Sequence, residues 1–293
     1  MEIVLSKYAG FCEGVARAYD MIEKIAKDPS AKRPIFVLGS LVHNSDVVAK
    51  IESMGVKKIS VENDLIKSLE KYPERIGTLV ITAHGIGPEI YGWAKGRGTN
   101  IADTTCPKVI KVQKLAEIFS KKGRQIVIVG EKNHKEVRGI YEWAGEKAFF
   151  VETDEDLDGL GLDGGKKIAV ISQTTQNRDF FKRVAEKLSE KYPNVEVIDT
   201  ICQATHHRQA EIKKLAEECD VAVVIGSPES ANSTRLWEIA KEINPKSYFI
   251  QRAEEIEREW FRECEKVAVT AGASTPGWVI DEVILRLRSM DES

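Results

Sequence analysis

Short apolar runs alternate with longer amphipathic segments along the chain. A typical run is 126–129, Ile-Val-Ile-Val, and typical amphipathic segments are 108–121 and 204–218, where apolar residues recur at helical spacing. Short β-branched runs predict buried strands, and the longer periodic segments predict helices. Because strands and helices alternate, the pattern predicts βαβ units and therefore an α/β fold with parallel sheets.

The same order of strands and polar loops occurs three times. In each copy one strand ends in or beside a glycine, a second leads into an acidic or polar turn, and a third ends in small polar residues. The first strands are 35–39, 126–130 and 221–226, the second are 59–62, 149–152 and 248–251, and the third are 81–84, 171–174 and 269–272. A repeat of this kind predicts one structural unit used three times.

Three of the five cysteines stand at matching places in these repeats. Cys12 and Cys106 are 94 residues apart, and Cys106 and Cys202 are 96 apart. Each lies between a strand-like run and a helical segment, and the last two follow the similar tripeptides Asp-Thr-Thr and Asp-Thr-Ile. Packing three units about an axis would bring the thiols together as a triangle. Such a triangle predicts a metal or cluster site.

We therefore expect three similar parallel-sheet α/β domains around a pseudo-threefold axis, with a central cluster site. The predicted domains are 13–104, 105–200 and 201–293, with the N-terminal segment 1–12 completing the third.

Three thiolates suit an iron–sulfur cluster with one open position. A cubane normally takes four cysteines, so three leave one iron open as a Lewis acid for a substrate oxygen. Pro107 suits a first helical turn, which would place the Cys106 thiolate at a helix N-terminus. Spacing alone also permits a [3Fe–4S] cluster or a cysteine-rich zinc site. Cys219 and Cys264 lie outside the repeat, and we expect them to be buried apolar residues.

Polar side chains follow the predicted strands and indicate a small anionic ligand. Histidines stand at three strand ends, and serine and asparagine occupy turns that open helices, where they cap helices or bind anions. Glu136, two residues beyond one histidine, is a candidate proton donor. The candidate anion-binding residues are His43, His84, His134, Ser230, Asn232 and Ser274.

Composition excludes several classes of partner. The net charge of −3, with both signs interspersed, leaves no basic patch for nucleic acid. No apolar run is long enough to span a bilayer, and the first residues lack the pattern of a signal peptide. We expect a cytoplasmic protein with reduced thiols. The GxGxxG sequence at 159–164 precedes a strand instead of following one, so we interpret it as a loop and not as a dinucleotide site.

Together these residues resemble the 4-hydroxy-3-methylbut-2-enyl diphosphate reductase (LytB) family over essentially the whole chain. The family's fold has three α/β domains about a pseudo-threefold axis. One departure is Ala231, where the family commonly has a second serine before the asparagine. The matching segments are Gly10-Phe11-Cys12, Val42-His43-Asn44, Ala83-His84-Gly85, Thr105-Cys106-Pro107, His134 with Glu136, Gln173-Thr174-Thr175, Ile201-Cys202 with Ala204-Thr205, Ser230 with Asn232, and Thr270-Ala271-Gly272-Ala273-Ser274.

The resemblance implies an enzyme, a reductase that removes the hydroxyl of (E)-4-hydroxy-3-methylbut-2-enyl diphosphate. The products would be isopentenyl and dimethylallyl diphosphate, in the last step of the methylerythritol phosphate route to isoprenoids. It also implies that Cys12, Cys106 and Cys202 bind a [4Fe–4S] cluster whose apical iron takes the substrate's hydroxyl oxygen. The six anion-binding candidates would hold the diphosphate.

The resemblance further implies the source of the proton and of the electrons. Glu136 would deliver the proton, with Thr174 and His134 beside it as catalytic and substrate-binding residues. A ferredoxin or flavodoxin would supply one electron at a time. Two alternatives are a non-catalytic iron–sulfur sensor or carrier, which leaves the histidines and Glu136 without a role, and a zinc hydrolase, which three soft thiolates disfavour.

Overall fold

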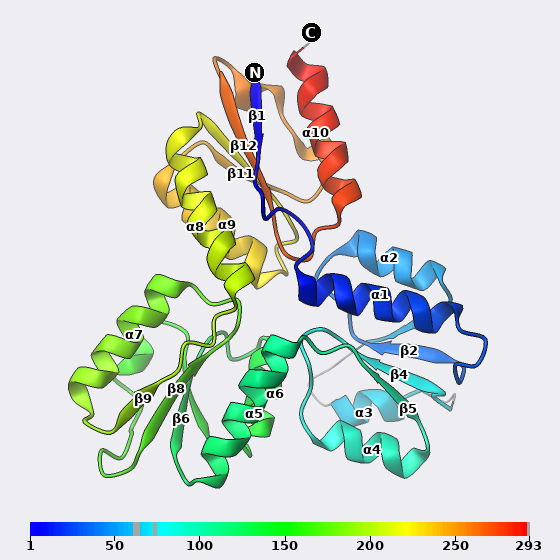
Figure 1. The fold of residues 1–293 in the computed structure, drawn as a ribbon, viewed down its shortest axis with the longest axis vertical. Coiled ribbons are helices and arrows are strands. Elements are labelled where there is room, and N and C mark those ends of the chain that lie inside the picture. Colours follow the sequence, from blue (N-terminus) through cyan, green and yellow to red (C-terminus); the bar gives the residue numbers. More distant parts are fainter. Residues whose placement is uncertain (61–64, 73–74, 292–293) are drawn as a thin grey trace. The chain divides into compact units, whose positions relative to one another are not determined.

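The computed structural model describes residues 1–60, 65–72 and 75–291, whose strands form three parallel four-stranded sheets flanked by helices (Figure 1). Every strand pair in these sheets is parallel, which confirms the predicted α/β class. The chain divides into two compact units. The first unit comprises Met1–Ala16, Val42–Val47 and Cys202–Ser293, and the second comprises Arg17–Leu41 and Val48–Ile201.

The first unit contains one sheet, in the strand order β1-β12-β10-β11. The N-terminal strand therefore pairs with the last strand of the chain, with Glu2 opposite Lys266. The elements of this unit are β1 (Glu2–Leu5), α8 (Gln203–Glu218), β10 (Val221–Ile225), α9 (Ala231–Ile243), β11 (Ser247–Ile250), the 3₁₀ turns η2 (Ala253–Glu255) and η3 (Arg258–Phe261), β12 (Lys266–Ala271) and α10 (Gly277–Asp291).

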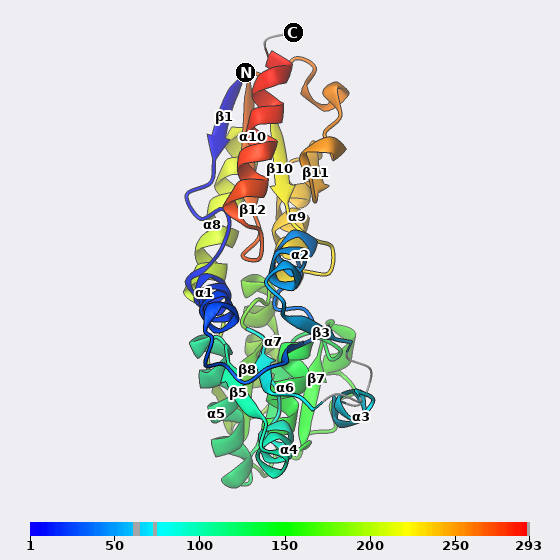
Figure 2. The same ribbon diagram turned by 90° about the vertical axis from the view of Figure 1, so that its right-hand side faces the viewer.

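Both faces of this sheet are buried. Successive residues of a strand point to opposite faces, and in β10 every residue is buried. Val221 and Val223 of β10 pack in the cluster that includes residues of α10. Their neighbours Ala222 and Val224 pack in a second cluster with α8 and α9. Figure 1 shows α10 on one side of the strands and α8 and α9 on the other, and in Figure 2 α10 lies in front of the strands. Burial on both faces explains why β10 is a continuous apolar run without polar alternation.

The second unit contains the other two sheets, in the orders β3-β2-β4-β5 and β7-β6-β8-β9. The first of these sheets is formed by β2 (Ile35–Leu38), β3 (Lys57–Ile59), β4 (Thr78–Ile81) and β5 (Asn100–Asp103), with helices α3 (Leu65–Glu70) and α4 (Glu89–Arg97). The second is formed by β6 (Gln125–Val129), β7 (Ala148–Val151), β8 (Ile168–Ser172) and β9 (Val195–Val197), with α5 (Pro107–Lys121), α6 (Lys135–Trp143), η1 (Glu155–Leu157) and α7 (Arg178–Lys191).

Two helices continue from one unit into the other along the chain. They are α1 (Glu13–Lys27) and α2 (Ser45–Ser53), and the division falls inside each of them. The predicted domains 13–104, 105–200 and 201–293, and their pseudo-threefold arrangement, stay a prediction.

The predicted strands are present, with shifted ends. Strand β4 ends at Ile81 and not at 84, because the polar residues after it leave the ladder for a turn in which the Gly85 N–H donates to the Thr82 carbonyl at 3.0 Å. Gly85 has a φ of 72°, which favours glycine. Similarly, β3 ends at Ile59, and residues 61 and 62 of the strand predicted at 59–62 lie outside the described residues.

Three further expectations concern loops, cysteines and membrane helices. Residues 159–164 form a loop between η1 and β8, which confirms that the GxGxxG sequence does not open a helix. Cys219 is buried in the core, as predicted, whereas Cys264 is only partly buried against it. Within the described ranges, no helix combines the length and apolarity needed to cross a membrane.

Candidate functional site

The predicted site residues are divided between the two units, and each unit carries a cluster of them. In both units they lie in loops after the strands or in the first turns of helices, where ligands of parallel sheets bind. The first unit contains Cys12, His43, Cys202, Ser230, Asn232 and Ser274, and the second contains His84, Cys106, His134, Glu136 and Thr174.

The three repeat cysteines all stand directly before a helix. Cys106 and Cys202 are the N-cap residues of α5 and α8, and Cys12 precedes α1. The carbonyl of each accepts an N–H from the residue four positions later, at 2.9 to 3.0 Å. Since a helix N-terminus favours negative charge, all three positions suit a sulfur ligand of a metal group. The Cys202 Sγ also accepts the Thr205 N–H at 3.3 Å.

These thiols have the chemistry that an iron–sulfur group requires of its ligands. None of the three forms a disulfide and all are partly accessible, whereas Cys219 is buried and lies at the end of α8. Three soft sulfur donors suit an iron–sulfur cluster, whereas hard cations such as magnesium prefer oxygen ligands.

Cys106 and His84 are connected through the ends of the neighbouring strands β4 and β5. The Cys106 N–H donates to the carbonyl of Ala83 at 3.0 Å. The following Gly85 cannot be replaced without strain, because a Cβ there would lie 2.5 Å from Gln113 Nε2 and 2.9 Å from a methyl of Thr105. The tight turn therefore fixes His84 beside the segment that carries Cys106.

Glu136 is a buried carboxyl group held by a single partner residue. It lies in the first turn of α6, after β6, and is only 2% exposed. The Thr174 N–H donates to Glu136 Oε1 at 2.6 Å, and the Thr174 hydroxyl donates to Oε2 at 2.8 Å. Thr174 follows β8, the strand that pairs with β6, so the parallel sheet brings the two residues together.

Burial raises the pKa of Glu136 to about 7, because the charged carboxylate loses its water. The two hydrogen bonds from Thr174 act in the opposite direction and lower this pKa. Roughly half of the Glu136 side chains are therefore protonated at neutral pH. A carboxyl group that titrates near the working pH is suited to donate a proton.

Two histidines lie beside this carboxyl group in the second unit. His134 caps α6, and its Nδ1 accepts the N–H of Glu136 at 3.2 Å. In the neutral ring the proton is therefore on Nε2. The His84 and His134 rings meet edge to face, with centroids 5.5 Å apart.

The first unit gathers hydroxyl and amide groups at the ends of β10 and β12. Ser230 caps α9, and its hydroxyl lies 3.3 Å from that of Ser274. The Ser274 hydroxyl also lies 3.4 Å from the carbonyl of His43, so these three residues are brought together. The His43 Nδ1 lies 3.5 Å from a carboxylate oxygen of Glu229, which is itself mostly exposed.

Asn232 provides a buried donor without a protein partner. It is 5% exposed, and its Nδ2 has no hydrogen-bond partner among the described residues. An unpaired buried amide is unfavourable by about 1–3 kcal/mol, so its presence at the start of a helix indicates a bound acceptor such as an anion.

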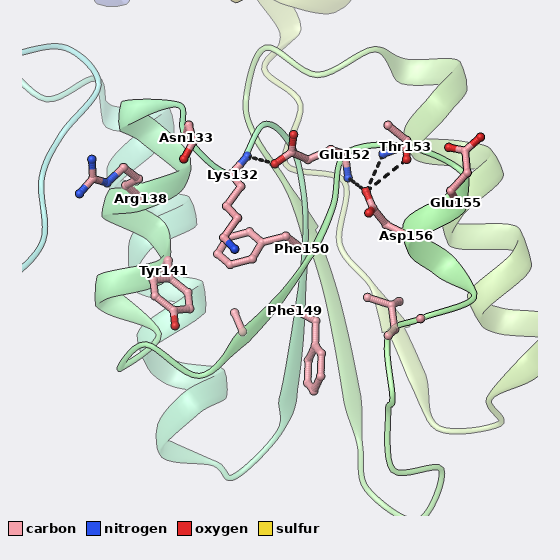
Figure 3. Close-up of a pocket in the computed structure, with 13 residues that line it drawn as sticks. Lys132, Asn133, Arg138, Tyr141, Phe149, Phe150, Glu152, Thr153, Glu155 and Asp156 are labelled. Carbon is pink, nitrogen blue, oxygen red and sulfur yellow. Dashed lines mark hydrogen bonds between the residues drawn. The ribbon is translucent and has the colours of Figure 1, made fainter. Parts of the chain in front are cut away.

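A separate groove of about 970 Å³ lies on the second unit along β7 (Figure 3). Its walls include Phe149 and Phe150 of β7 and Arg138 and Tyr141 of α6. Of the described residues that line it, none belongs to the predicted site.

Sequence reasoning missed Arg208. It lies on α8 six residues after Cys202, is 4% exposed, and interacts electrostatically with Cys12 and Cys202. The available signal was an arginine on the helix that begins at a predicted ligand, three residues before the acidic residue Glu211.

Comparisons with known proteins identify relatives of this chain. Residues 3–288 match the family model described as LytB protein. The chain is 38% identical to 4-hydroxy-3-methylbut-2-enyl diphosphate reductase of Aquifex aeolicus, covering 100% of this chain and 98% of the relative. The enzyme of the same name from Geobacter sulfurreducens is 40% identical, covering 99% of this chain and 98% of the relative.

Two solved structures are similar in fold over nearly the whole chain. One is the E-1-hydroxy-2-methyl-but-2-enyl-4-diphosphate reductase of Plasmodium falciparum, with a TM-score of 0.88 and 32% identity over 97% of this chain and 87% of that one. The other, described as the terminal enzyme of the non-mevalonate pathway, has a TM-score of 0.69 and 37% identity over 99% of this chain and 100% of its own. The resemblance inferred from the sequence is confirmed, and the chain belongs to the LytB protein family.

Proposed function

We propose that this chain is a reductase that converts (E)-4-hydroxy-3-methylbut-2-enyl diphosphate to isopentenyl and dimethylallyl diphosphate. The observation that carries the proposal, in a chain of this family, is the buried carboxyl group of Glu136, whose pKa is raised to about 7 beside His134. An acid of this kind is what the departure of a hydroxyl group requires.

The reaction breaks one C–O bond and consumes two electrons and two protons. One proton leaves with the hydroxyl oxygen as water. The other is added to carbon, at one end of the allylic system or the other, which accounts for two isomeric products.

Cys12, Cys106 and Cys202 would hold the iron–sulfur group, and their places before three helices suit thiolate ligands. When bound, this [4Fe–4S] cluster supplies the electrons one at a time and a Lewis acid at the hydroxyl group. The electrons come from an external carrier of the ferredoxin or flavodoxin type.

Glu136 acts as the acid for the departing hydroxyl group. Hydroxide is a poor leaving group, so a proton must reach the oxygen as the bond breaks. Thr174 holds both carboxyl oxygens and thereby sets the direction in which the proton is presented. His134 orients the same turn of α6 through its bond to the Glu136 N–H.

The diphosphate is bound by neutral donors and not by a lysine cluster. The unpaired Asn232 amide and the Nε2–H of His134 are donors of the required kind. Ala231 is the first residue of α9, where backbone N–H groups are unsatisfied within the helix, so the backbone there replaces the missing serine hydroxyl. The proposed diphosphate ligands are His43, His84, His134, Ser230, Asn232 and Ser274, with Thr174 beside them.

The proposal is tested by anaerobic purification followed by iron, sulfide and turnover measurements. We expect about four iron atoms and four sulfides per chain, with both reduced or lost in Cys106→Ser. The loaded protein with reduced methyl viologen should convert the hydroxylated diphosphate to both products, detected by mass spectrometry. A full cluster without turnover would favour a sensor or carrier, and zinc without sulfide would refute the reductase.

Replacing Glu136 by glutamine should separate proton delivery from binding. The amide has the same shape but cannot act as an acid, so kcat should fall by a factor of about 100 to 10,000 while the cluster content is unchanged. The matched control is Glu142→Gln on the same helix, a carboxyl group whose pKa burial also raises. Near-normal turnover in Glu136→Gln would exclude Glu136 as the proton source.

The rate should depend on pH through the protonation of Glu136. Since the protonated form is the active one and the pKa is about 7, kcat should be highest below this pH and fall as the pH rises through it. The Thr174 hydroxyl bond lowers this pKa, so Thr174→Val should move the fall to higher pH. A kcat profile that is flat or rises between pH 6 and 8 (roughly one unit on each side) would contradict the assignment.

Removing the unpaired amide should weaken binding more than chemistry. Asn232→Leu keeps the side-chain volume but not the donor, so KM should rise about tenfold, with kcat changed less. Thr234→Ala, on the same helix and with its hydroxyl directed to the Pro228 carbonyl, is the control and should bind normally. An unchanged KM in Asn232→Leu would remove this residue from the diphosphate site.

A further inference from the structure

The segment that carries Cys12 is attached to the helix that begins at Cys202. This segment, residues 6–12, connects β1 to α1. Glu211 of α8 accepts hydrogen bonds from it: the Lys7 N–H at 3.0 Å, the Tyr8 N–H at 3.4 Å and the Ser6 hydroxyl. The carboxylate thus binds three donors of the loop, of which the Tyr8 N–H also donates to the Ser6 hydroxyl oxygen at 3.2 Å.

Arg208 makes the second attachment, one turn earlier on the same helix. One terminal nitrogen donates to the Gly10 carbonyl at 2.7 Å, and the other donates to the Ala204 carbonyl at 3.0 Å. Gly10 has a φ of 90°, and a Cβ there would lie 3.1 Å from Ile280. The guanidinium therefore holds the loop by its hydrogen bond to Gly10, two residues before Cys12.

The positive charge of Arg208 faces two of the thiols of this unit, those of Cys12 and Cys202. Burial lowers the pKa of this guanidinium, while Cys12, Cys202 and Glu211 act in the opposite direction. An arginine remains protonated even so, and a buried cation requires anionic neighbours. Glu211 is already occupied by three donors, and the Arg208 Nε has no hydrogen-bond partner in the described part of the chain.

We propose that Arg208, together with Glu211, is a positioning residue for the metal ligands: it fixes the Cys12 loop on α8 and supplies a buried positive charge to the Cys12 and Cys202 thiolates. The proposal rests on the proposed function insofar as the thiolates hold a cluster. A fixed positive charge also stabilises the reduced, more negative form of such a group, so Arg208 raises its midpoint potential.

The test compares Arg208→Gln, Arg208→Lys and the control Arg286→Gln, an exposed arginine on α10 of the same unit. In the loaded protein, Arg208→Gln should shift the midpoint potential to more negative values and release iron to a chelator about tenfold faster. Arg208→Lys should restore the potential, because it keeps the charge, while iron release stays fast. The control variant should have the same midpoint potential and the same rate of iron release as the protein without a substitution.

A second readout needs no cluster. In the metal-free protein, backbone amides of residues 6–12 should exchange hydrogen about tenfold faster in Arg208→Gln than in the control, with exchange in β10 and β12 unchanged. Unchanged potential, iron release and exchange in Arg208→Gln would overturn the inference. If the unchanged protein binds no cluster, the proposed function fails, while the exchange measurement still decides whether Arg208 holds the loop.

Discussion

Burial of both faces of the sheets is the constraint on which the placement of all polar chemistry depends. In β10, alternate residues enter separate apolar clusters on opposite sides of the sheet, so the strand has no face on which to present a catalytic group. Polar side chains are therefore carried by the loops after the strands and by the helices that follow. In parallel sheets these loops lie at one edge. Burial of both sheet faces thus gathers the polar side chains in the loops at one edge of each sheet.

Groups brought together in this way need specific partners, because a polar atom next to an apolar core is unstable unless it is satisfied. Glu136 has both oxygens bonded to one threonine, and Arg208 bonds to two carbonyls of different segments. The Asn232 amide has no partner among the described residues, which leaves a buried donor for a bound anion. The hydrogen bonds of Glu136 and Arg208 therefore define the fixed part of the site, and the Asn232 amide is a donor for a ligand.

The sequence predicted the class of fold because its strongest signal is local. Apolar runs such as 126–129 and 221–225 specify strands by themselves, and repeat order predicted the matching cysteines. Strand ends were less predictable: β4 stops at Ile81 because hydrogen bonding in the turn, and not apolarity, decides where the ladder ends. The role of Arg208 was not predictable from spacing, since the Gly10 carbonyl, one of the two that it binds, lies 198 residues away along the chain. The raised pKa of Glu136 likewise depends on Thr174, 38 residues away, and on burial that appears only after folding.

The pairing of β1 with β12 has a consequence for biosynthesis. Strand β1 is translated long before β12, the strand beside it, so β1 has no neighbour in the sheet until Lys266–Ala271 has been made. Both sheets of the second unit can form during this interval, because their strands all lie between residues 35 and 197. Since domains fold as their segments emerge, the loop with Cys12 is translated before the strands of both these sheets but is ordered after them. Of the three repeat cysteines, Cys12 therefore has the longest interval between its synthesis and the ordering of its loop.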